Sequence, residues 1–322
     1  MQTRQLGTTD LHLTPIGFGA WAIGGEWRFG WGPQDDDASV AAIRQAVARG
    51  MNWIDTAPAY GLGHSEEVVA RALRDVPAGE RPLVFTKCTL VWDEHRTVSH
   101  NLTGESIRRE VEGSLRRLEV ERLDLYQMHW PRWAAQQAPS PGSVEEAWAT
   151  LAELQREGKV RHIGVSNFTV ADLDAARAIA PVASLQPPYS LLRRDVEREL
   201  LPYCAEHGIG VLVYSPMLSG LLTGAMTRER IERLAPGDWR RNNIEFQEPR
   251  LTKNLALVEV LRAVGERHAR GPGEVAIAWV LRHPAVTAAI VGGRSAAQVD
   301  GVVGAADLEL SAQDVAEIEA AL

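Results

Sequence analysis

Four side chains that can move a proton or stabilise a charge each come at or near the end of a short apolar segment of the sequence. Asp55 ends the segment Asn-Trp-Ile-Asp, and Tyr60 follows it by five residues. Lys87 ends Leu-Val-Phe-Thr-Lys, and His129 ends Leu-Asp-Leu-Tyr-Gln-Met-His. If these segments are neighbouring strands, their order brings a carboxylate, a phenol, an ammonium group and an imidazole to one edge of a sheet.

These four groups together suit the reduction of a carbonyl. A free tyrosine titrates at about pH 10, so a phenol that donates a proton at neutral pH needs a nearby cation or hydrogen-bond donor to stabilise its anion. Lys87 supplies the cation, and Asp55 offsets the cost of burying it. His129 can donate a hydrogen bond to a substrate oxygen. Each residue alone has a structural explanation, as a cap, an ion-pair member or a packed ring, but their order at successive strand ends favours the joint catalytic interpretation.

Apolar β-rich runs alternate with helical patterns along the chain, which predicts an α/β fold. Segments such as Gly-Val-Leu-Val at 210–213 indicate burial on both faces, so a parallel sheet closed as a (β/α)8 TIM barrel is favoured over an open one. A barrel reaches 322 residues as one domain, and no linker is visible, so we treat residues 1–322 as a single domain. We expect an N-terminal β-hairpin at 3–6 and 12–15, strands at 16–19, 52–55, 83–87, 123–129, 162–166, 183–186, 210–214 and 288–291, and helices at 38–49, 65–75, 103–117, 145–157, 170–178, 196–207, 253–269 and 274–282.

Long segments without this alternation follow the carboxyl ends of the predicted strands, where barrels carry their active-site loops. They span 24–37, 91–101, 130–143 and 218–250, and they are rich in aromatic residues. One interpretation is that the aromatic rings line a substrate site, and the other is that they pin the loops to the mouth of the barrel. The tryptophans expected to contact a substrate are Trp21, Trp27, Trp92 and Trp130.

Composition argues against several other classes of protein. The chain has 45% hydrophobic and 24% charged residues, no run approaches the roughly 18 apolar residues of a membrane helix, and the net charge of −8 comes without a basic stripe. We therefore expect neither a membrane nor a nucleic-acid partner. Cys88 and Cys204 lack the spacing of a metal site, so no metal is expected. Few cysteines and no secretory signal favour the cytoplasm.

Motifs for other cofactors and nucleophiles are weak or absent. The segment 17–22, Gly-Phe-Gly-Ala-Trp-Ala, imitates a dinucleotide fingerprint after a strand. Ile-Gly-Gly follows it instead of a helix, so no helix N-terminus would hold a pyrophosphate. A P-loop and a serine nucleophile elbow are both missing from the sequence.

Six stretches form a specific set: 52–61, 86–87, 123–130, 158–168, 186–190 and 214–216. Together they resemble the aldo-keto reductase superfamily over nearly the whole chain, and its bacterial members in the branch that includes channel β-subunit-like and aryl-alcohol-dehydrogenase-like reductases. The resemblance implies a (β/α)8 barrel and a nicotinamide cofactor bound without a Rossmann domain. It also implies that Tyr60 is the general acid and that Asp55, Lys87 and His129 complete a catalytic tetrad.

The resemblance also implies cofactor contacts. Ser166 and Asn167, joined by Gln186, would hydrogen-bond the nicotinamide carboxamide, and the ring of Tyr214 would stack on the nicotinamide. Arg294 would bind a 2′-phosphate with help from Ser295 and Gln298. The full set of expected cofactor residues is Ser166, Asn167, Gln186, Tyr214, Ser215, Pro216, Leu218, Gly220, Gly292, Arg294, Ser295 and Gln298.

The chain departs from the family pattern at its nucleotide end. Gly301 and Val302 stand where the family commonly has Glu and Asn against the adenine. Val291 replaces a common Pro, and Gly292 stands where some members have a phosphate-binding Lys. The expectation of NADP(H), with NAD(H) as the alternative, therefore depends mainly on Arg294.

Three classes of function follow from the sequence. The preferred one is NADPH-dependent, reversible reduction of aldehydes or ketones to alcohols, with a small-molecule carbonyl substrate and a monomeric or homo-oligomeric protein. The second is a binding or regulatory protein, because channel-associated β subunits share the family. The third is a lyase or aldolase that uses Lys87 as a Schiff base.

Overall fold

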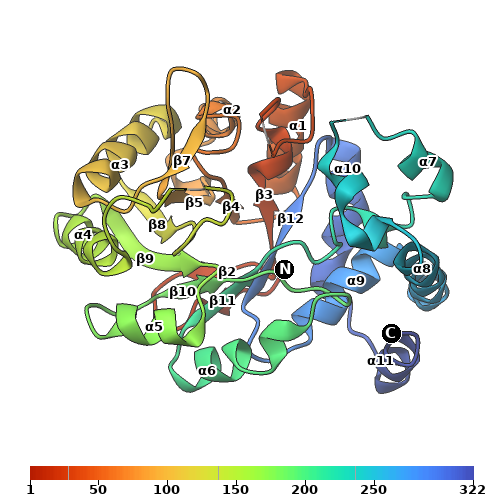
Figure 1. Cartoon of the computed structure of the whole chain (residues 1–322). Helices are drawn as coiled ribbons and strands as arrows, with labels where there is room; N and C mark the ends of the chain where they lie inside the picture. The colour runs from red at the N-terminus through yellow and green to blue at the C-terminus, as the bar shows by residue number, and fades with distance from the viewer. Residues whose placement is uncertain (28, 137, 236) are drawn as a thin grey trace.

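Eight parallel strands close into a barrel within the described residues, which confirms the expected (β/α)8 fold. The computed structural model describes residues 1–27, 29–136, 138–235 and 237–322. The strand order around the barrel is β10-β11-β12-β3-β4-β5-β8-β9. Because β12 pairs with β3, strands from the two ends of the sequence close the barrel, and Figure 1 shows them side by side in blue and red.

The helices form an outer ring around these strands (Figure 1). The strands are β1 Arg4–Gln5, β2 His12–Leu13, β3 Ile16–Gly19, β4 Trp53–Asp55, β5 Leu83–Cys88, β6 Leu90–Trp92, β7 Val98–His100, β8 Leu123–Met128, β9 Val160–Ser166, β10 Ser184–Gln186, β11 Gly210–Val213 and β12 Ala288–Gly292. The helices are α1 Asp36–Ala48, α2 His64–Leu73, α3 Gly104–Leu118, α4 Val144–Arg156, α5 Val170–Arg177, α6 Leu200–Glu206, α7 Arg228–Glu232, α8 Arg250–Arg267, α9 Pro272–Leu281, α10 Ala296–Val303 and α11 Ala312–Glu319. In the described ranges, no helix is both long and apolar enough to cross a membrane.

An apolar layer fills the lower part of the barrel. Trp53, Phe85 and Leu125 belong to one buried cluster, which leucines of the β1–β2 hairpin complete from below. Phe85 pairs with Leu125 on the neighbouring strand, and two residues further along the same strands Lys87 pairs with Gln127. Since alternate residues of a strand point to the same side, the polar side chains of Lys87 and Gln127 stand directly above the apolar layer.

Several elements differ from the sequence-based expectation. The segment 91–101 was expected to be irregular, but β6 and β7 form a hairpin there. Helices α10 and α11 extend the chain beyond the last predicted strand. The residues after β3 form one 3-10 turn, Ala20–Ile23, in place of the α-helix that a dinucleotide fingerprint requires. This 3-10 turn is consistent with the conclusion from the sequence that the segment after the first barrel strand is not a dinucleotide-binding motif.

The loop that carries Tyr60 touches the loop after β3 through a direct backbone contact between Gly61 and Gly24. Gly61 has a φ of +65°, and a Cβ built on it would lie 1.8 Å from the carbonyl oxygen of Gly24. A Cβ on Gly24 would lie 2.8 Å from the carbonyl carbon of Tyr60. Neither position therefore has space for a side chain, and this contact fixes the backbone on both sides of the phenol.

We expect Gly61→Ala to destabilise the fold more than Gly50→Ala. Gly50 also has a positive φ, +90°, but a Cβ added to it would meet nothing within 4 Å. The control carries only left-handed strain, about 1–2 kcal/mol, whereas Gly61→Ala adds overpacking of about 1–3 kcal/mol. Urea unfolding of both variants measures the difference, and equal losses of stability would contradict the close contact.

Candidate active site

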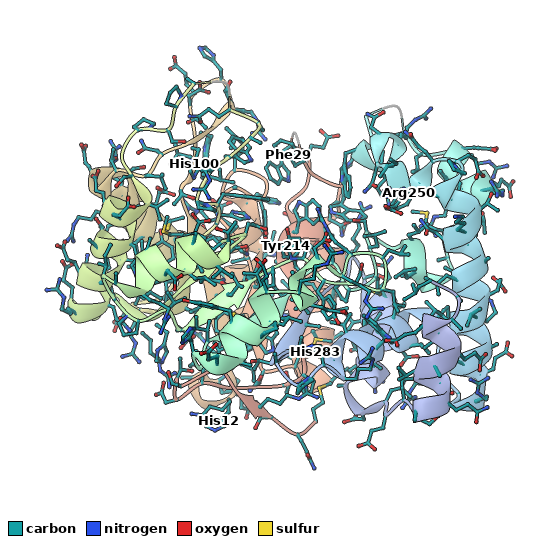
Figure 2. The ribbon with its side chains drawn as sticks, turned by 60° about the horizontal axis from the view of Figure 1, so that its bottom comes forward. His12, Phe29, His100, Tyr214, Arg250 and His283 are labelled. Atoms are coloured by element: carbon teal, nitrogen blue, oxygen red, sulfur yellow. The ribbon has the colours of Figure 1, made fainter. Side chains whose placement is uncertain are left out.

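A cavity of about 680 Å³ opens among the loops at the carboxyl ends of the barrel strands. In Figure 2, Tyr214 lies near the middle of the molecule and Phe29 lies above it, between His100 on one side and Arg250 on the other. The predicted site residues that line the cavity are Trp21, Trp27, Asp55, Tyr60, His129, Trp130, Ser166, Asn167, Gln186, Tyr214, Ser215, Pro216, Gly220, Gly292, Arg294 and Gln298.

An ion pair buried in the barrel supports one end of this cavity. Lys87 Nζ donates to Asp55 Oδ2 at 2.6 Å, to the carbonyl oxygen of Thr56 at 2.9 Å and to Tyr60 Oη at 3.4 Å. These acceptors use all three ammonium hydrogens. The Lys87 side chain is fully buried and that of Asp55 nearly so, and the second carboxylate oxygen accepts from two side-chain amides. Both charges are therefore paired and hydrogen-bonded, as a buried ion pair requires.

The phenol of Tyr60 keeps its proton. Burial, with the negative charge of Asp55 adding, raises the pKa of Tyr60 well above its ordinary value. The residue pattern alone predicts instead that Lys87 favours the phenolate. The difference arises first because the phenol is buried, and second because Lys87 Nζ lies 2.6 Å from the carboxylate and 3.4 Å from the phenol, so the ammonium pairs mainly with Asp55.

His129 presents a neutral ring beside this phenol. The two ring centroids are 5.7 Å apart with an interplanar angle of 79°. Burial, with the charge of Lys87 adding, lowers the pKa of His129 well below its ordinary value. Nδ1 is enclosed and has no hydrogen-bond partner among the described residues. Because an enclosed N–H without an acceptor is rarer than an unused lone pair, the hydrogen belongs on Nε2, toward the cavity.

Three side chains of the cavity wall keep free acceptor atoms among the described residues. Asn167 Nδ2 donates to the His129 carbonyl and to Ser166 Oγ, both at 3.0 Å, and Asn167 Oδ1 accepts from Tyr214 Oη at 2.8 Å. Ser166 Oγ donates to the carbonyl of Gln186 at 2.8 Å. Lone pairs remain on Asn167 Oδ1, Ser166 Oγ and Gln186 Oε1, and they fit the N–H groups of a carboxamide.

The backbone around these acceptors adopts strained conformations. Asn167, Ser215, Leu218 and Ser219 all have a left-handed φ, between 45° and 62°. Non-glycine residues hold such angles only where the surrounding structure enforces them, and they concentrate at ligand sites. Burial raises the pKa of Tyr214 to about 12, so its hydroxyl keeps the hydrogen bond to Asn167.

Arg294, at the opposite end of the cavity, is held by the loop after β3. Its Nε donates to Gln34 Oε1 at 2.5 Å, its Nη2 to the carbonyl of Pro33 at 2.5 Å and its Nη1 to the carbonyl of Trp31 at 3.5 Å. Its backbone N–H donates to Gln298 Oε1 at 2.8 Å. Loop acceptors therefore occupy much of the guanidinium fork that the sequence assigns to a phosphate.

Aromatic rings from several loops surround the phenol end of the cavity. The ring centroid of Trp27 lies 6.1 Å from that of Tyr60, and Trp27 meets Phe29 edge to face at 5.6 Å. Phe29 meets Trp133 in the same way at 6.0 Å, and Trp130 also lines the wall. These contacts form a broad apolar surface around the proton donor.

A second aromatic cluster joins the loops after β3 and β11. Trp21 stacks on Trp239 at 5.7 Å, and Trp31 meets both rings edge to face at 5.5 and 5.9 Å. The guanidinium of Arg240 lies 4.6 Å from the centroid of Trp31. The rings thus do both things that the sequence analysis considered, since some wall the cavity and others hold its loops together.

Three predicted contact residues lie outside the cavity wall. The Trp92 ring packs under the guanidinium of Arg117 at 5.7 Å, so the structure does not bring it to the substrate site. Leu218 is buried in the core. Ser295 caps α10 through its hydroxyl, which accepts from the backbone N–H of Gln298.

Sequence reasoning missed several residues of the site. Gln127 is fully buried and contacts Asp55, and its position inside an apolar strand was a usable signal. The segment 218–250 was expected to be an active-site loop, but only Leu218 and Gly220 within it were predicted as contacts. Further lining residues that were not predicted include Leu90, Met217, Ser219, Thr223, Met226, Arg230 and Arg240.

Comparisons with known proteins agree with this geometry. A sequence model of the Aldo/keto reductase family matches residues 15–322. Aldo-keto reductase YhdN of Bacillus subtilis (strain 168) is 35% identical over 323 residues, which cover 100% of this chain and 94% of the relative. The NADH-specific methylglyoxal reductase of Escherichia coli (strain K12) is 36% identical over 325 residues, which cover 98% and 96%. The structure of the glycerol dehydrogenase AKR11B4 from Gluconobacter oxydans matches with a TM-score of 0.88 and 37% identity, covering 99% and 94%.

We expect the ring of His129 to stay neutral throughout the range in which an ordinary histidine titrates. Its folded-state pKa is depressed, so lowering the pH from 8 to 5 should not protonate it while the protein remains folded. NMR of ¹⁵N-histidine-labelled protein measures this, with free ¹⁵N-histidine in the same buffer as the reference. A His129 signal that changes with pH in step with that of the free amino acid would contradict the neutral ring.

Proposed function

Because the chain belongs to the aldo/keto reductase family and is therefore a nicotinamide-dependent oxidoreductase, we propose that it reduces aldehydes or ketones to alcohols with Tyr60 as the proton donor. The observation that carries the proposal is a protonated phenol that lines the cavity beside a neutral imidazole and a buried ammonium group. Bound nicotinamide supplies the hydride. Ser166, Asn167 and Gln186 would hold its carboxamide through their free acceptors.

Two residues of this chain orient the carbonyl and supply the proton. The Nε2–H of His129 donates to the carbonyl oxygen of the substrate and orients it toward Tyr60. Tyr60 gives its proton to the same oxygen as negative charge develops there. Alcohol oxidation needs the ionised phenol, so the raised pKa of Tyr60 favours reduction at neutral pH and moves oxidation to alkaline pH.

The alternative functions have less support. A Schiff-base lyase needs a lysine nitrogen that reaches the substrate, but Lys87 is fully buried and its three hydrogens are directed at protein oxygens. A purely regulatory role leaves the convergence of Tyr60, His129 and the ion pair at one cavity unexplained.

The cavity wall supports a neutral, apolar substrate. Trp27, Phe29, Trp130 and Trp133 form its surface near the proton donor. The arginines that line the cavity come from the connection between β11 and α8, which includes α7, and from the turn after β12. We therefore propose aromatic or large aliphatic aldehydes as the best substrates, ahead of small polar carbonyls of the kind named for the methylglyoxal reductase.

Replacing Tyr60 by Phe should lower the rate of carbonyl reduction about 10²–10⁴-fold, because the general acid is lost while the ring remains. The affinity for NADPH should change little. Spectrophotometric assays with benzaldehyde and methylglyoxal, together with cofactor titration by Trp fluorescence, measure both quantities. Tyr126→Phe is the matched control, since it removes a buried phenol hydroxyl from outside the cavity wall. Wild-type turnover in Tyr60→Phe would disprove the assigned proton donor.

We also propose NADPH as the preferred cofactor, with Arg294 as the group that recognises the 2′-phosphate. The guanidinium lines the cavity, and a phosphate is a stronger partner for it than the neutral oxygens of Gln34 and Pro33. The competing possibility is that Arg294 only anchors the loop. One relative is named as NADH-specific, which supports the alternative that Arg294 does not recognise a phosphate.

Arg294→Ala should weaken NADPH binding about ten- to a hundredfold and NADH binding much less, because only NADPH loses a charge-assisted contact. Gln34→Ala is the control, since it removes the side-chain contact between this loop and Arg294 Nε but keeps the guanidinium. Fluorescence titration of both cofactors on both variants measures the change. If the two cofactors lose affinity equally in Arg294→Ala, and Gln34→Ala does the same, Arg294 is a loop anchor and the phosphate role is wrong.

A further inference from the structure

The carboxylate of Asp55 is held on both of its oxygens by protein groups. Oδ2 accepts from Lys87 at 2.6 Å. Oδ1 accepts from Gln186 Nε2 at 2.9 Å and from Gln127 Nε2 at 3.3 Å. The two amides also contact each other, because Gln186 Nε2 donates its second hydrogen to Gln127 Oε1 at 3.2 Å. The carboxylate thus lies between an ammonium group on one side and a linked pair of amides on the other.

Gln127 lies deeper in the barrel than the amide it contacts, that of Gln186. Gln186 lines the cavity, whereas Gln127 is fully buried and is absent from the described residues of the cavity wall. It pairs with Lys87 across β5 and β8, one layer above the Phe85–Leu125 pair. Any influence of Gln127 on the reaction must therefore pass through Asp55 and Gln186.

On this basis we infer that Gln127 is a positioning residue, which together with Gln186 fixes the orientation of the Asp55 carboxylate and so sets the electrostatic field at Tyr60. This inference depends on the proposed function, because it concerns how the proton donor of that reaction is tuned. Without the Gln127 amide, Oδ1 keeps only the donor from Gln186, so the carboxylate is held less firmly against Lys87 and its negative charge acts more strongly on the phenol.

The other charged and titratable groups around this carboxylate stay in place in the test. Lys87 comes from β5, Tyr60 from the loop after β4 and His129 from the end of β8. Tyr214, after β11, interacts electrostatically with Tyr60, and Glu66 of α2 interacts with Lys87. None of these groups is altered in the variants below, so a changed pH profile reports on the amide.

Gln127→Met removes the donor at nearly constant volume. We expect kcat for reduction to fall about tenfold, the size of one lost hydrogen bond to a charged group. The KM for the carbonyl and the dissociation constant of NADPH should stay within about twofold. The pH optimum of alcohol oxidation should move upward by about one unit, since the phenol becomes harder to ionise.

Gln127→Glu provides a second test with the same side-chain length. At low pH the new carboxyl is protonated, so it can donate to Asp55 Oδ1 and accept from Gln186 as the amide does. Two carboxylates in one buried site raise the pKa of one of them, so deprotonation should occur within the assay range and remove activity as the pH rises. We therefore expect a new descending limb in the pH profile of reduction, with near-wild-type kcat on its acid side.

Ser184→Ala is the matched control. Ser184 is fully buried in β10, the strand that also carries Gln186, and its hydroxyl has no partner among the described residues. Its loss removes a buried polar group without touching Asp55, so kcat and both pH profiles should match the wild type.

The outcomes separate two kinds of failure. If the wild type does not reduce carbonyls, or Tyr60→Phe is fully active, the proposed function fails. If the wild type behaves as proposed but Gln127→Met keeps its kcat and oxidation optimum, or Gln127→Glu shows no new limb, the positioning role of Gln127 is wrong. Equal shifts of kcat and oxidation optimum in Ser184→Ala and Gln127→Met would likewise overturn it. The loss of any buried polar group in the barrel would then be enough to produce the effect.

Discussion

The ion pair between Lys87 and Asp55 is the interaction on which the rest of the site depends. Both charges are removed from water, so each must find its partners within the protein, and breaking such a pair typically costs about 3–5 kcal/mol. The ammonium takes a carboxylate, a backbone carbonyl and a phenol, and the carboxylate takes the ammonium and two amides. The phenol of Tyr60 therefore has the Lys87 ammonium group as a fixed neighbour, but it keeps its proton.

The barrel supplies these partners through its two-residue period. Trp53, Phe85 and Leu125 form an apolar layer, and the residues two positions later on the same strands are Asp55, Lys87 and Gln127. The polar layer is therefore closed from below by packed rings and leucine side chains, while the cavity opens above it. A (β/α)8 barrel can hold such a charged layer because its interior is filled with side chains and water has no access from the lower end.

The sequence was sufficient to predict the barrel fold and the residues at the centre of the site, but not the conformation of the loops. Strands with apolar residues on both faces, and polar residues at their carboxyl ends, are local signals, so the sequence alone places Asp55, Tyr60, Lys87 and His129 together. The Ser311–Asp314 capping box is also a readable signal for α11, although no helix was predicted there. The raised pKa of Tyr60 was not readable, because it depends on distances between strands. The position of Trp92 depends in the same way on a hairpin and on Arg117.

The backbone contact between Gly24 and Gly61 has a consequence for redesign of this enzyme. Loops are the usual segments to exchange between related barrels when a different substrate range is wanted. Here the loop after β3, which carries Trp27 and Phe29, meets the tyrosine loop at Gly24 and Gly61 with no side chain between the two backbones. A transplanted β3 loop will therefore fit only if it brings a glycine and the same chain path to this contact, so the two loops have to be moved together as one module.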